Sequence, residues 1–417
     1  MKYGLIGEKL GHSFSKEIHE KIENYDYRLQ EIAREDLDDF MTKREFVAIN
    51  VTIPYKEAVI PHLSSIDDKA KAIGAVNTIV NSNGKLHGYN TDFLGMEALI
   101  KKAGIEPEGK KVVILGSGGT AKTAFAVAKY MGASDVICTS RTGKGECITY
   151  EELYKNHSDV DIIINTTPCG MFPNCGDVPV EIDRFPKLSG VIDAIYNPLR
   201  TNLVLSALKK GIKAEGGLYM LASQAVFAAE KFTGKRYDLS VTDKAYNDIF
   251  SSKENIVLIG MPASGKTTVG KIISQITSRE IIDTDAMIVE KSKMEITDIF
   301  EKYGEKYFRD LESECVEEAS AKNGCIIATG GGAILRKENV DSLSRNGKIY
   351  FIDRPLSSLI PTSDRPLASD EEAIRKRYTE RYCIYCDSAN EIIDADCSAD
   401  EVAQKILKQH YLQTEVQ

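Results

Sequence analysis

The sequence predicts an α/β protein with two nucleotide-binding domains, because two segments share one construction. In each, an apolar run opens into a glycine-rich turn that precedes a stretch with helical apolar spacing. The first run is 111–115 and leads to Gly116, and the second is 255–259 and leads to Gly260. Such a strand, turn and helix N-terminus present backbone N–H groups and the positive end of the helix dipole to an anion. The turns differ in chemistry, which favours two separate domains over repeats of one.

Length and composition are those of a globular protein with several domains. The 417 residues predict about two to four domains, and 42% hydrophobic with 28% charged residues excludes a disordered chain. A net charge of −9 excludes a diffuse positive field for nucleic acid or anionic lipid. We expect no membrane span, which needs about 18–20 apolar residues, and no signal peptide. Nine scattered cysteines predict free thiols in a reduced, cytoplasmic protein.

The remaining elements follow from apolar runs and their spacing. Strands expected at 3–6, 46–52 and 78–81 predict a small α/β domain in the first 100 residues. Between the two turns, strands at 162–164 and 191–195 alternate with helical patterns, which predicts a parallel sheet with crossovers. The polar and charged segment from Arg236 to Asn255 is the best candidate for a linker.

The residues after the strand 136–139 indicate which dinucleotide the first turn binds. They are needed because a glycine-rich turn alone is weak evidence for a cofactor. An NAD-preferring fold places an acidic residue here for the ribose 2′-OH. This chain has Arg141 between two hydroxyl side chains, a set that suits a 2′-phosphate. An exposed surface arginine is the alternative, but together with the turn we predict NADP(H). The expected cofactor residues are Gly116, Ser117, Gly118, Gly119, Thr120, Ala121, Ser140, Arg141 and Thr142.

Polar side chains are dense in the first 100 residues. Ser13 and Ser15 place hydroxyls at i and i+2, and the segment 50–56 ends a strand with alternating polar groups and Lys56. Each of these residues alone is more simply explained as a turn or a cap. Two amides and a carboxylate follow downstream: Asn77, Asn90 and Asp92.

Residues 1–240 contain a series of short motifs. They are Ser13-x-Ser15, Asn50-Val-Thr52-x-Pro-x-Lys56, Asn77-Thr78, Asn90-Thr-Asp92, Gly116-x-Gly118-Gly119, Ser140-Arg141-Thr142, Asn165-Thr-Thr-Pro-Cys-Gly-Met171, Asp193-Ala-Ile-Tyr196-Asn-Pro198 and Gly217-Leu-Tyr-Met-Leu-Ala-Ser-Gln224. In order and spacing, these motifs resemble shikimate dehydrogenase. Departures are Lys16 and Glu20, where the family usually has Pro and Asn.

This resemblance implies roles for individual residues. Ser13 and Ser15 would bind the carboxylate of shikimate, and Lys56 with Asp92 would flank the reacting carbon–oxygen bond. An ammonium beside a ketone can give up a proton as hydride arrives. Thr52, Asn77, Tyr196 and Gln224 would complete the substrate site, and Gly217 would contact the cofactor.

The second turn, Gly260-x-x-x-x-Gly265-Lys266-Thr267, has the P-loop pattern with a strand before and a helix after it. Backbone N–H groups would wrap the phosphates of ATP, Lys266 would span the β and γ oxygens, and Thr267 would reach Mg²⁺. Related small kinases usually have glycine at position 263, and we expect Ala263 to adopt an ordinary backbone conformation. The expected nucleotide residues are Gly260, Ala263, Ser264, Gly265, Lys266, Thr267 and Thr268.

Further motifs follow the P-loop. The run 281–285 is expected to be a strand whose Asp283 and Asp285 lie on one side of the sheet. A buried strand runs into three glycines, which permit close approach of a ligand to the backbone. Arg309 is expected on a helix-like segment, Arg365 in a loop and Arg381 on a helix. For each arginine alone, an ion pair on the protein surface is the alternative to a ligand contact. The residues are Arg309, Gly330, Gly331, Gly332, Arg365 and Arg381.

Over about residues 252–410 these motifs resemble shikimate kinase. The resemblance implies that Asp285, Arg309, Arg381 and the three glycines hold shikimate. Asp283 and Thr267 would serve Mg²⁺, and Arg365 would come from a mobile lid to neutralise the transferring phosphoryl group. The basic residue that usually precedes the Arg-Pro-Leu motif is not evident.

Together the resemblances imply a bifunctional enzyme that reduces 3-dehydroshikimate with NADPH and then phosphorylates shikimate with ATP and Mg²⁺. Two rivals stay open: quinate-type or other polyol-acid substrates, and a regulatory binding protein in which one half has lost its chemistry. A monomer and a homodimer are equally compatible with the sequence. The expected division is 1–100 with 218–240 for substrate binding, 101–217 for a Rossmann NADP domain, a linker at 241–254, and a P-loop kinase domain at 255–417.

Overall fold

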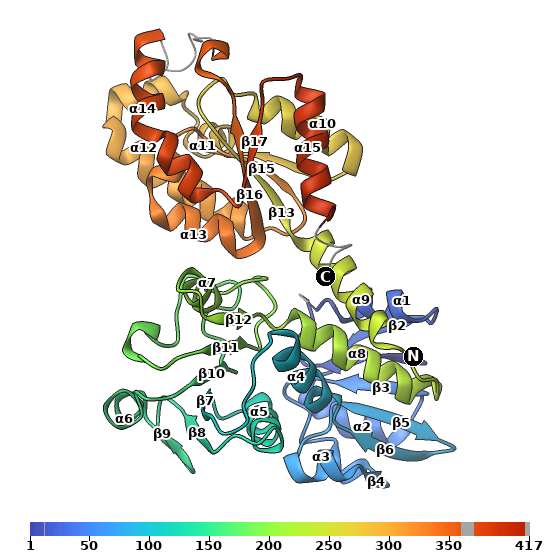
Figure 1. The fold of residues 1–417 in the computed structure, drawn as a ribbon. Helices are drawn as coiled ribbons and strands as arrows, with labels where there is room; N and C mark the ends of the chain where they lie inside the picture. Colours follow the sequence, from blue (N-terminus) through green and yellow to red (C-terminus); the bar gives the residue numbers. More distant parts are fainter. Residues whose placement is uncertain (12, 360–370, 413–417) are drawn as a thin grey trace. The chain divides into compact units, whose positions relative to one another are not determined.

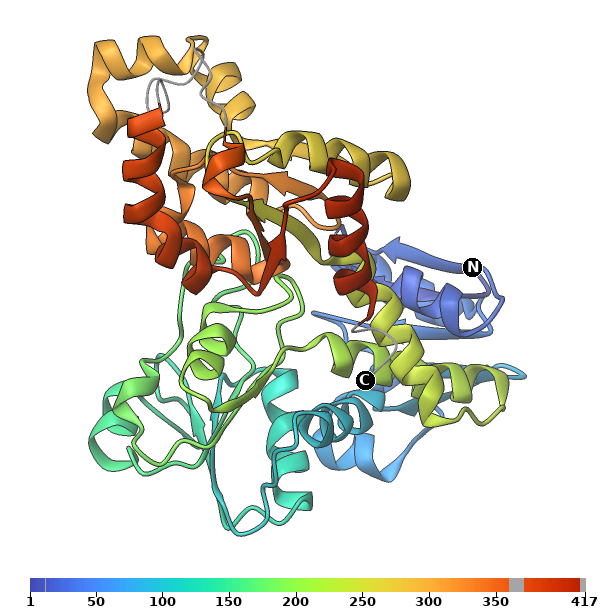
Figure 2. The same cartoon turned by 45° about the horizontal axis from the view of Figure 1, so that its top comes forward.

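The computed structural model describes residues 1–11, 13–359 and 371–412, which form two units, 1–249 and 250–417 (Figure 1 and Figure 2). The segment 241–254, for which the sequence predicts a linker, lies almost entirely in helix α9 (Leu239–Lys253). Several side chains of α9 are buried, Ala245 among them. No helix of the described ranges is long and apolar enough to cross a membrane.

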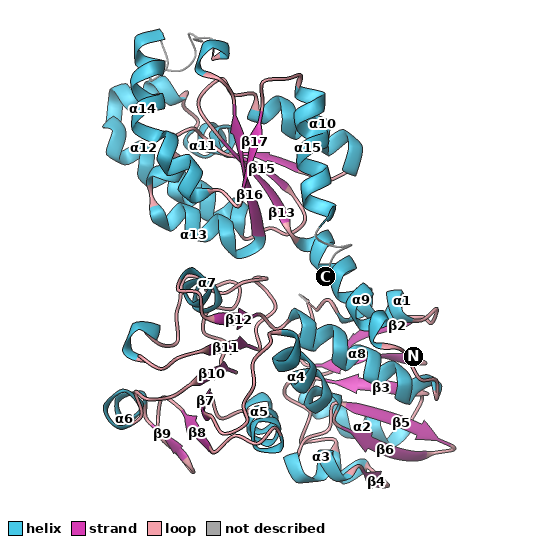
Figure 3. Ribbon diagram, viewed as in Figure 1, coloured by secondary structure: helices cyan, strands magenta, loops and turns pink. Residues whose placement is uncertain are grey.

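A mixed six-stranded sheet forms the first part of unit 1 (Figure 3). Its order is β2-β1-β3-β5-β6-β4, with β1, β2 and β3 parallel and β5 antiparallel to both neighbours. The expected strands at 3–6, 46–52 and 78–81 are all present. The elements are β1 (Tyr3–Gly7), α1 (Ser15–Ile22), β2 (Tyr27–Glu31), α2 (Leu37–Lys43), β3 (Ala48–Val51), β4 (Ser65–Ile66), α3 (Asp68–Ile73), β5 (Thr78–Ser82), β6 (Lys85–Tyr89) and α4 (Thr91–Lys102).

Helix α8 (Leu218–Thr233), which follows the last strand of unit 1 along the chain, packs against this first sheet. It packs against α4 and α1, and its Ala228 and Phe232 join a buried cluster with Leu5 of β1 and Tyr27 of β2. Burial of such apolar side chains contributes about 1.5–3 kcal/mol each. The packing of α8 on α4 brings the polar residues at the starts of both helices to the same edge of the sheet.

The second sheet of unit 1 is parallel throughout, as the alternating pattern predicts. Its order is β12-β11-β10-β7-β8-β9. The chain reverses direction across the sheet between β7 and β10, and ligands of such sheets bind outside the carboxyl ends of the strands at this point. The elements are β7 (Lys111–Leu115), α5 (Gly119–Tyr130), β8 (Asp135–Thr139), β9 (Cys147–Ile148), α6 (Tyr150–Asn156), β10 (Ile162–Asn165), β11 (Gly190–Asp193), α7 (Asn202–Lys209) and β12 (Lys213–Glu215).

Cysteine pairing departs from the sequence-based expectation. Cys138 of β8 and Cys147 of β9 are opposite in the strand register and form a disulfide. The prediction that the nine cysteines are thiols is therefore wrong for this pair, while the other seven form no disulfide. The prediction failed because it used only the scatter of cysteines along the chain, whereas strand pairing decides which of them meet.

Unit 2 is a three-layer domain around a parallel sheet of order β14-β15-β13-β16-β17. Helices α10 and α15 cover one face, and α12, α13 and α14 cover the other (Figure 1). The elements are β13 (Asn255–Ile259), α10 (Lys266–Thr277), β14 (Ile281–Asp283), α11 (Thr284–Ser292), α12 (Ile296–Ser320), β15 (Ile326–Ala328), α13 (Lys337–Asn346), β16 (Gly347–Asp353), α14 (Glu371–Ser388), β17 (Glu391–Asp394) and α15 (Ala399–Leu412).

Candidate active sites

The candidate substrate site of unit 1 is a cavity of about 370 Å³. Its wall comes from the loop before α1, the end of β3, the residue before β5, the first turn of α4, the segment after β11, and α8. All the residues that the sequence predicts for substrate binding in this unit line the cavity, and Gly217, predicted to contact the cofactor, lies there too: Ser13, Ser15, Thr52, Lys56, Asn77, Asp92, Tyr196, Gly217 and Gln224.

Lys56 and Asp92 form an ion pair in this wall. Lys56 Nζ donates to Asp92 Oδ2 at 2.6 Å, and the two side chains are only 18% and 12% exposed. Asp92 lies in the first turn of α4, where the N-cap Asn90 accepts a hydrogen bond from Phe93 N. Lys56 also lines the neighbouring cofactor cavity. The pair therefore stands where a substrate carbonyl and a dinucleotide would meet.

A buried chain of hydrogen bonds holds Asn77 in place. Thr91 N donates to Asn77 Oδ1 at 2.7 Å, and Asn50 Nδ2 donates to Asn77 O at 3.2 Å. Tyr27 OH donates in turn to Asn50 Oδ1 at 2.8 Å. Sequence reasoning assigned no site role to Asn50 or Thr91. The available signal was their polarity at the end of an apolar strand and at a helix start, because a buried polar group needs a partner.

The candidate dinucleotide site is a second cavity, of about 880 Å³, at the carboxyl ends of β7, β8 and β10. It also includes Tyr150, Thr166, Thr167 and a loop up to Pro179, none of which had an assigned role; the apolar strand that precedes Thr166 was the available signal. Ala121 lies elsewhere, buried on α5 and facing a different cavity. The expected cofactor residues that do line it are Gly116, Ser117, Gly118, Gly119, Thr120, Ser140, Arg141 and Thr142.

The Gly116 turn keeps its shape through close backbone packing. Gly116 has φ +116°, and a Cβ there would lie 2.7 Å from Thr166 Oγ1. Thr166 Oγ1 donates to Leu115 O at 2.7 Å and so joins the end of β10 to the end of β7. The helix α5 begins at Gly119, so its free N–H groups face the cavity. Arg141, at the carboxyl end of β8, supplies a cation beside them.

Asp193, at the end of β11, is a buried carboxylate that organises the same edge. Its Oδ1 accepts from Asn165 Nδ2 and Ile195 N, both at 3.0 Å, and its Oδ2 accepts from Thr201 Oγ1 at 2.6 Å. Burial raises the pKa of Asp193 to about 6, against the lowering effect of these hydrogen bonds. Both carboxylate oxygens of Asp193 already accept hydrogen bonds from protein donors, so we interpret Asp193 as a structural residue.

The P-loop of unit 2 leads from β13 to α10. Lys266 Nζ donates to Gly260 O at 2.8 Å and to Met261 O at 3.0 Å and is buried. Ser264 is also buried, while Thr268 is exposed on the first turn of α10. Ala263 has φ +65°, so the expectation of an ordinary backbone there is wrong. The loop imposes a left-handed conformation that an L-residue adopts at a cost of about 1–2 kcal/mol.

Two oxygen ligands meet beside the P-loop. Thr267 Oγ1 donates to Asp283 Oδ2 at 2.8 Å, and Asp283 Oδ1 accepts from Asp285 N at 3.0 Å. A hydroxyl and a carboxylate beside the phosphate loop fit the oxygen preference of Mg²⁺. We expected Asp285 to continue the strand, but β14 ends at Asp283. Asp285 lies in the first turn of α11, because Asp283 caps that helix.

The residues expected to hold an acceptor in unit 2 gather around the three glycines after β15. A Cβ on Gly330 would lie 2.4 Å from Asp285 Oδ1, and one on Gly332 would lie 2.0 Å from Arg309 Nη1. Arg381 Nη1 donates to Gly331 O at 3.3 Å. Only glycine leaves room for this arrangement. Arg365 was also predicted, but it lies outside the described residues.

Two neighbours of this cluster were not predicted as site residues. Glu312 accepts from Arg309 Nη1 at 2.7 Å, and burial, the largest cause, raises its pKa. Tyr385 OH donates to Gly331 O at 2.5 Å. The signal was their helical spacing from the arginines: Glu312 follows Arg309 by three positions and Tyr385 follows Arg381 by four, so each pair shares a helix face.

The fold and sites define a dinucleotide-dependent oxidoreductase followed by a P-loop phosphotransferase. Residues 5–79 match the family model "Shikimate dehydrogenase substrate binding domain", and residues 262–411 match the model "Shikimate kinase". Shikimate dehydrogenase (NADP(+)) of Clostridium perfringens strain SM101 is 37% identical over 265 residues, covering 59% of this chain and 97% of that protein.

Solved structures of shikimate dehydrogenases also match unit 1. The chorismate mutase/shikimate 5-dehydrogenase fusion protein of Clostridium acetobutylicum has a TM-score of 0.56 at 37% identity, over 59% of this chain and 96% of that one. Shikimate 5-dehydrogenase of Thermus thermophilus in complex with NADP(H) and shikimate has a TM-score of 0.54 at 27% identity, over 60% and 99%. The chain belongs to the shikimate dehydrogenase family, and its C-terminal unit carries a shikimate kinase domain.

Proposed function

We propose that this protein catalyses two consecutive reactions: reduction of 3-dehydroshikimate to shikimate with NADPH, and phosphorylation of shikimate with ATP. The observation that carries the proposal is the Lys56–Asp92 pair, which lines both the substrate cavity and, through Lys56, the dinucleotide cavity. The P-loop unit, matched to shikimate kinase, would use the product of the first reaction.

In the first reaction Lys56 supplies the proton, and NADPH, when bound, would supply the hydride. The Lys56 ammonium donates to the ketone oxygen as negative charge develops on it, and Asp92 keeps Nζ oriented at 2.6 Å. Ser13 and Ser15, whose hydroxyls lie 3.1 Å apart, bind the substrate carboxylate. Such positioned proton transfer contributes about 10²–10⁴-fold to the rate.

In the second reaction the chain positions an alcohol against the γ-phosphate of ATP. Asp285 accepts the hydrogen bond of the acceptor hydroxyl, while Arg309 and Arg381 bind the carboxylate of shikimate. Lys266 leaves the carbonyls of Gly260 and Met261, which it contacts in this structure, and binds phosphate oxygens instead. Thr267 and Asp283 would hold Mg²⁺, which supplies charge neutralisation on the phosphates.

The proposed setting is the cytoplasm, with small anionic metabolites as the partners rather than nucleic acid or a membrane. The net charge of −9 disfavours nucleic acid and anionic lipid as partners. Small anions would instead be attracted by local cations such as Arg141 and Lys266.

A coupled assay tests the proposal. The full chain is mixed with 3-dehydroshikimate, NADPH, ATP and Mg²⁺, and both NADPH consumption and shikimate 3-phosphate are measured. We expect both. Lys56→Ala should lose the first signal by about 10²-fold or more and keep the kinase rate on added shikimate, whereas Asp285→Asn should do the reverse. Turnover on quinate at the shikimate rate, or binding without any turnover, would contradict the proposal.

A further inference from the structure

The disulfide of unit 1 lies beside the residues proposed to bind NADP(H). Cys138 is the second-to-last residue of β8 and precedes Ser140 and Arg141 by two and three positions, and Cys147 is the first residue of β9. The cross-link therefore closes the segment 139–146, which carries Arg141. Both cysteines are partly exposed and line a cavity of about 750 Å³, so a small thiol can reach them.

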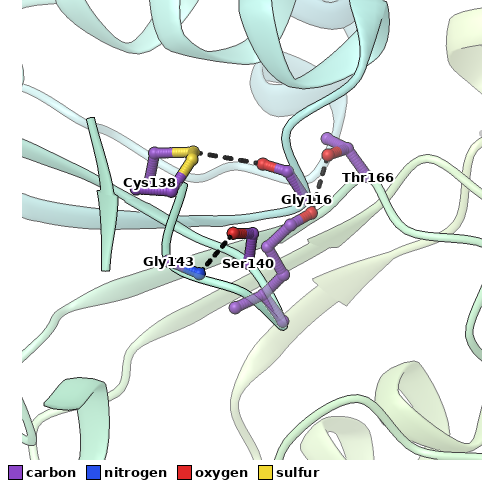
Figure 4. The surroundings of a disulfide bond; sticks show 7 residues. Gly116, Cys138, Ser140, Gly143 and Thr166 are labelled. Atoms are coloured by element: carbon purple, nitrogen blue, oxygen red, sulfur yellow. Dashed lines mark hydrogen bonds between the residues drawn. A yellow bond between two sulfur atoms is a disulfide. The ribbon is translucent and has the colours of Figure 1, made fainter. Parts of the chain in front are cut away.

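The far end of this segment lies on a short edge strand. Strand β9 has two residues, pairs with β8 and is the edge of the sheet. Outside this pairing, Ser140 N donates to Ile148 O at 3.0 Å, and Cys147 N donates to Lys144 O at 3.4 Å. Within the segment, Gly143 N donates to Ser140 Oγ at 3.1 Å (Figure 4). A two-residue edge strand loses order readily once a cross-link is removed.

The sulfur of Cys138 also touches the phosphate-binding turn. Its Sγ lies 3.2 Å from Gly116 O (Figure 4). A thiol at this position can donate to that carbonyl, whereas a disulfide sulfur has no proton to donate. The oxidation state of one sulfur thus alters contacts of both parts of the cofactor site, the Gly116 turn and the Arg141 segment.

We propose that Cys138 and Cys147 form a reversible redox pair that sets the affinity of unit 1 for its dinucleotide. The inference rests on the proposed function in that the dinucleotide is NADP(H). The disulfide form holds Arg141 ready for the 2′-phosphate and binds tightly. The dithiol form leaves the segment to be ordered during binding, which lowers affinity.

The reducing partner is a dithiol of small-molecule or protein origin. One of its thiolates attacks a sulfur of the pair and forms a mixed disulfide, and its second thiol then displaces the enzyme sulfur. The bond between Cys138 and Cys147 breaks, two cysteine thiols form with the two protons of the dithiol, and the reductant leaves as its own disulfide. Oxidation is the reverse exchange with a disulfide oxidant.

The test compares the full chain after treatment with dithiothreitol and with its oxidised cyclic form. Thiol alkylation and mass spectrometry report the state of the pair, and nucleotide fluorescence reports the Kd for NADPH and NADH. We expect reduction to raise the Kd for NADPH about 10-fold and to change the Kd for NADH less, because the Arg141 segment is proposed to bind the 2′-phosphate, which NADH lacks. The kcat at saturating NADPH and the kinase rate should stay the same.

Cysteine variants separate the pair from the other thiols. Cys147→Ser, on the edge strand, should have the weak affinity in both conditions, and so should Cys138→Ser if it folds. Cys383→Ser, an exposed cysteine of unit 2, should respond as the unmodified chain does.

Three results would overturn the inference: an unchanged Kd although alkylation shows an open pair, tight binding by Cys147→Ser, or a response to reduction that survives in that variant. NADPH binding in neither state would instead overturn the proposed dehydrogenase function, and this inference with it.

Discussion

The two glycine-rich turns follow the same kind of strand but obtain their positive charge differently. In unit 1 the Gly116 turn contains no cation, and Arg141 is supplied by the end of the adjacent strand β8. In unit 2 the cation, Lys266, is the first residue of the helix that follows the turn. Its ammonium binds two carbonyls of the turn itself.

This difference matches what each turn binds. A dinucleotide extends across the ends of several strands, so its 2′-phosphate can be read by a neighbouring strand. A triphosphate is compact and reacts at its last phosphate, so the charge must be close to the reacting atoms. We therefore expect the loss of Lys266 to affect the chemical step, and the loss of Arg141 to affect mainly binding and selectivity.

The largest expected effect is that of Lys266→Ala. It removes the cation closest to the transferring phosphate, so phosphorylation should fall by about 10³-fold or more. The kinase rate with shikimate and ATP measures this loss. The dehydrogenase rate of the same protein should not change, and Lys271→Ala, an exposed lysine on the same helix, should keep both rates. Comparable loss in Lys271→Ala would assign the effect to general charge.

The next effect concerns the carboxylates at strand ends, Asp193 in unit 1 and Asp283 in unit 2. Asp283 Oδ2 accepts a hydrogen bond from Thr267 of the P-loop, whereas Asp193 accepts hydrogen bonds from groups outside the ligand site, such as Asn165. The folded-state pKa of Asp193, about 6, lies above its ordinary 3.8. The folded chain therefore binds more protons between these values, and the stability from this group is full below pH 3.8 and is lost as pH rises through 6.

A pKa of about 6 in place of 3.8 corresponds to about 3 kcal/mol of unfolding free energy. Asp193→Asn should remove this slope of stability against pH, because an amide does not titrate. The variant should still fold, because Thr201 can reverse its hydroxyl toward the amide. The unmodified chain and Asp193→Asn are unfolded with urea at pH 4 to 7, and amide exchange at β10 and β11 reports local unfolding. The difference between their unfolding free energies at each pH gives the contribution of Asp193. Identical slopes in the two proteins would show that Asp193 does not titrate in this range.

Arg141→Ala tests the cation of unit 1. We expect the KM for NADP(H) to rise about 10- to 100-fold, since a hydrogen bond to a charged group contributes about 1.5–3 kcal/mol. The KM for NAD(H) should change little, so the preference between the cofactors falls. Lys144→Ala, in the same loop, serves as the charge control. A drop in kcat without a rise in KM would place Arg141 in the chemical step and erase the contrast with Lys266.

The smallest effect is expected at Ala263, where the P-loop forces a left-handed backbone. Ala263→Gly removes about 1–2 kcal/mol of strain but adds unfolded-state entropy, so unit 2 should gain about 0.5–1 kcal/mol. Ser278→Gly, at φ +59° after α10, is the matched control outside the loop. Thermal unfolding measures both. Stabilisation by Ser278→Gly alone would mean that the P-loop tolerates alanine without strain.

Much of the fold was predictable from local pattern. The buried runs 111–115 and 255–259 coincide with β7 and β13, and the alternation of strands and helices predicted parallel sheets. These segments are apolar on both faces, and such runs form central strands with little dependence on context. Where the pattern is polar, the prediction was less informative: the segment 241–254 lies in the helix α9.

Site residues were predictable where a motif specifies both residue type and local structure. The P-loop and the segment 50–56 are of this kind. Asn50 and Thr91 were missed because their partner Asn77 lies more than a dozen positions away. Glu312 was missed because its role depends on burial, which its helical spacing from Arg309 does not report. Asp285 shows the same limit, since the cap formed by Asp283 ends the strand before it.

The sequence by itself determined the fold class, the two nucleotide sites and the ligands that their motifs favour, because hydrophobic period and turn chemistry act over a few residues. Only the tertiary structure decided which side chains meet. It joined Lys56 to Asp92 at 2.6 Å, placed Cys138 opposite Cys147 and forced Ala263 into a left-handed turn. These outcomes depend on strand register and helix packing, which are set by the burial of whole elements rather than by neighbouring residues.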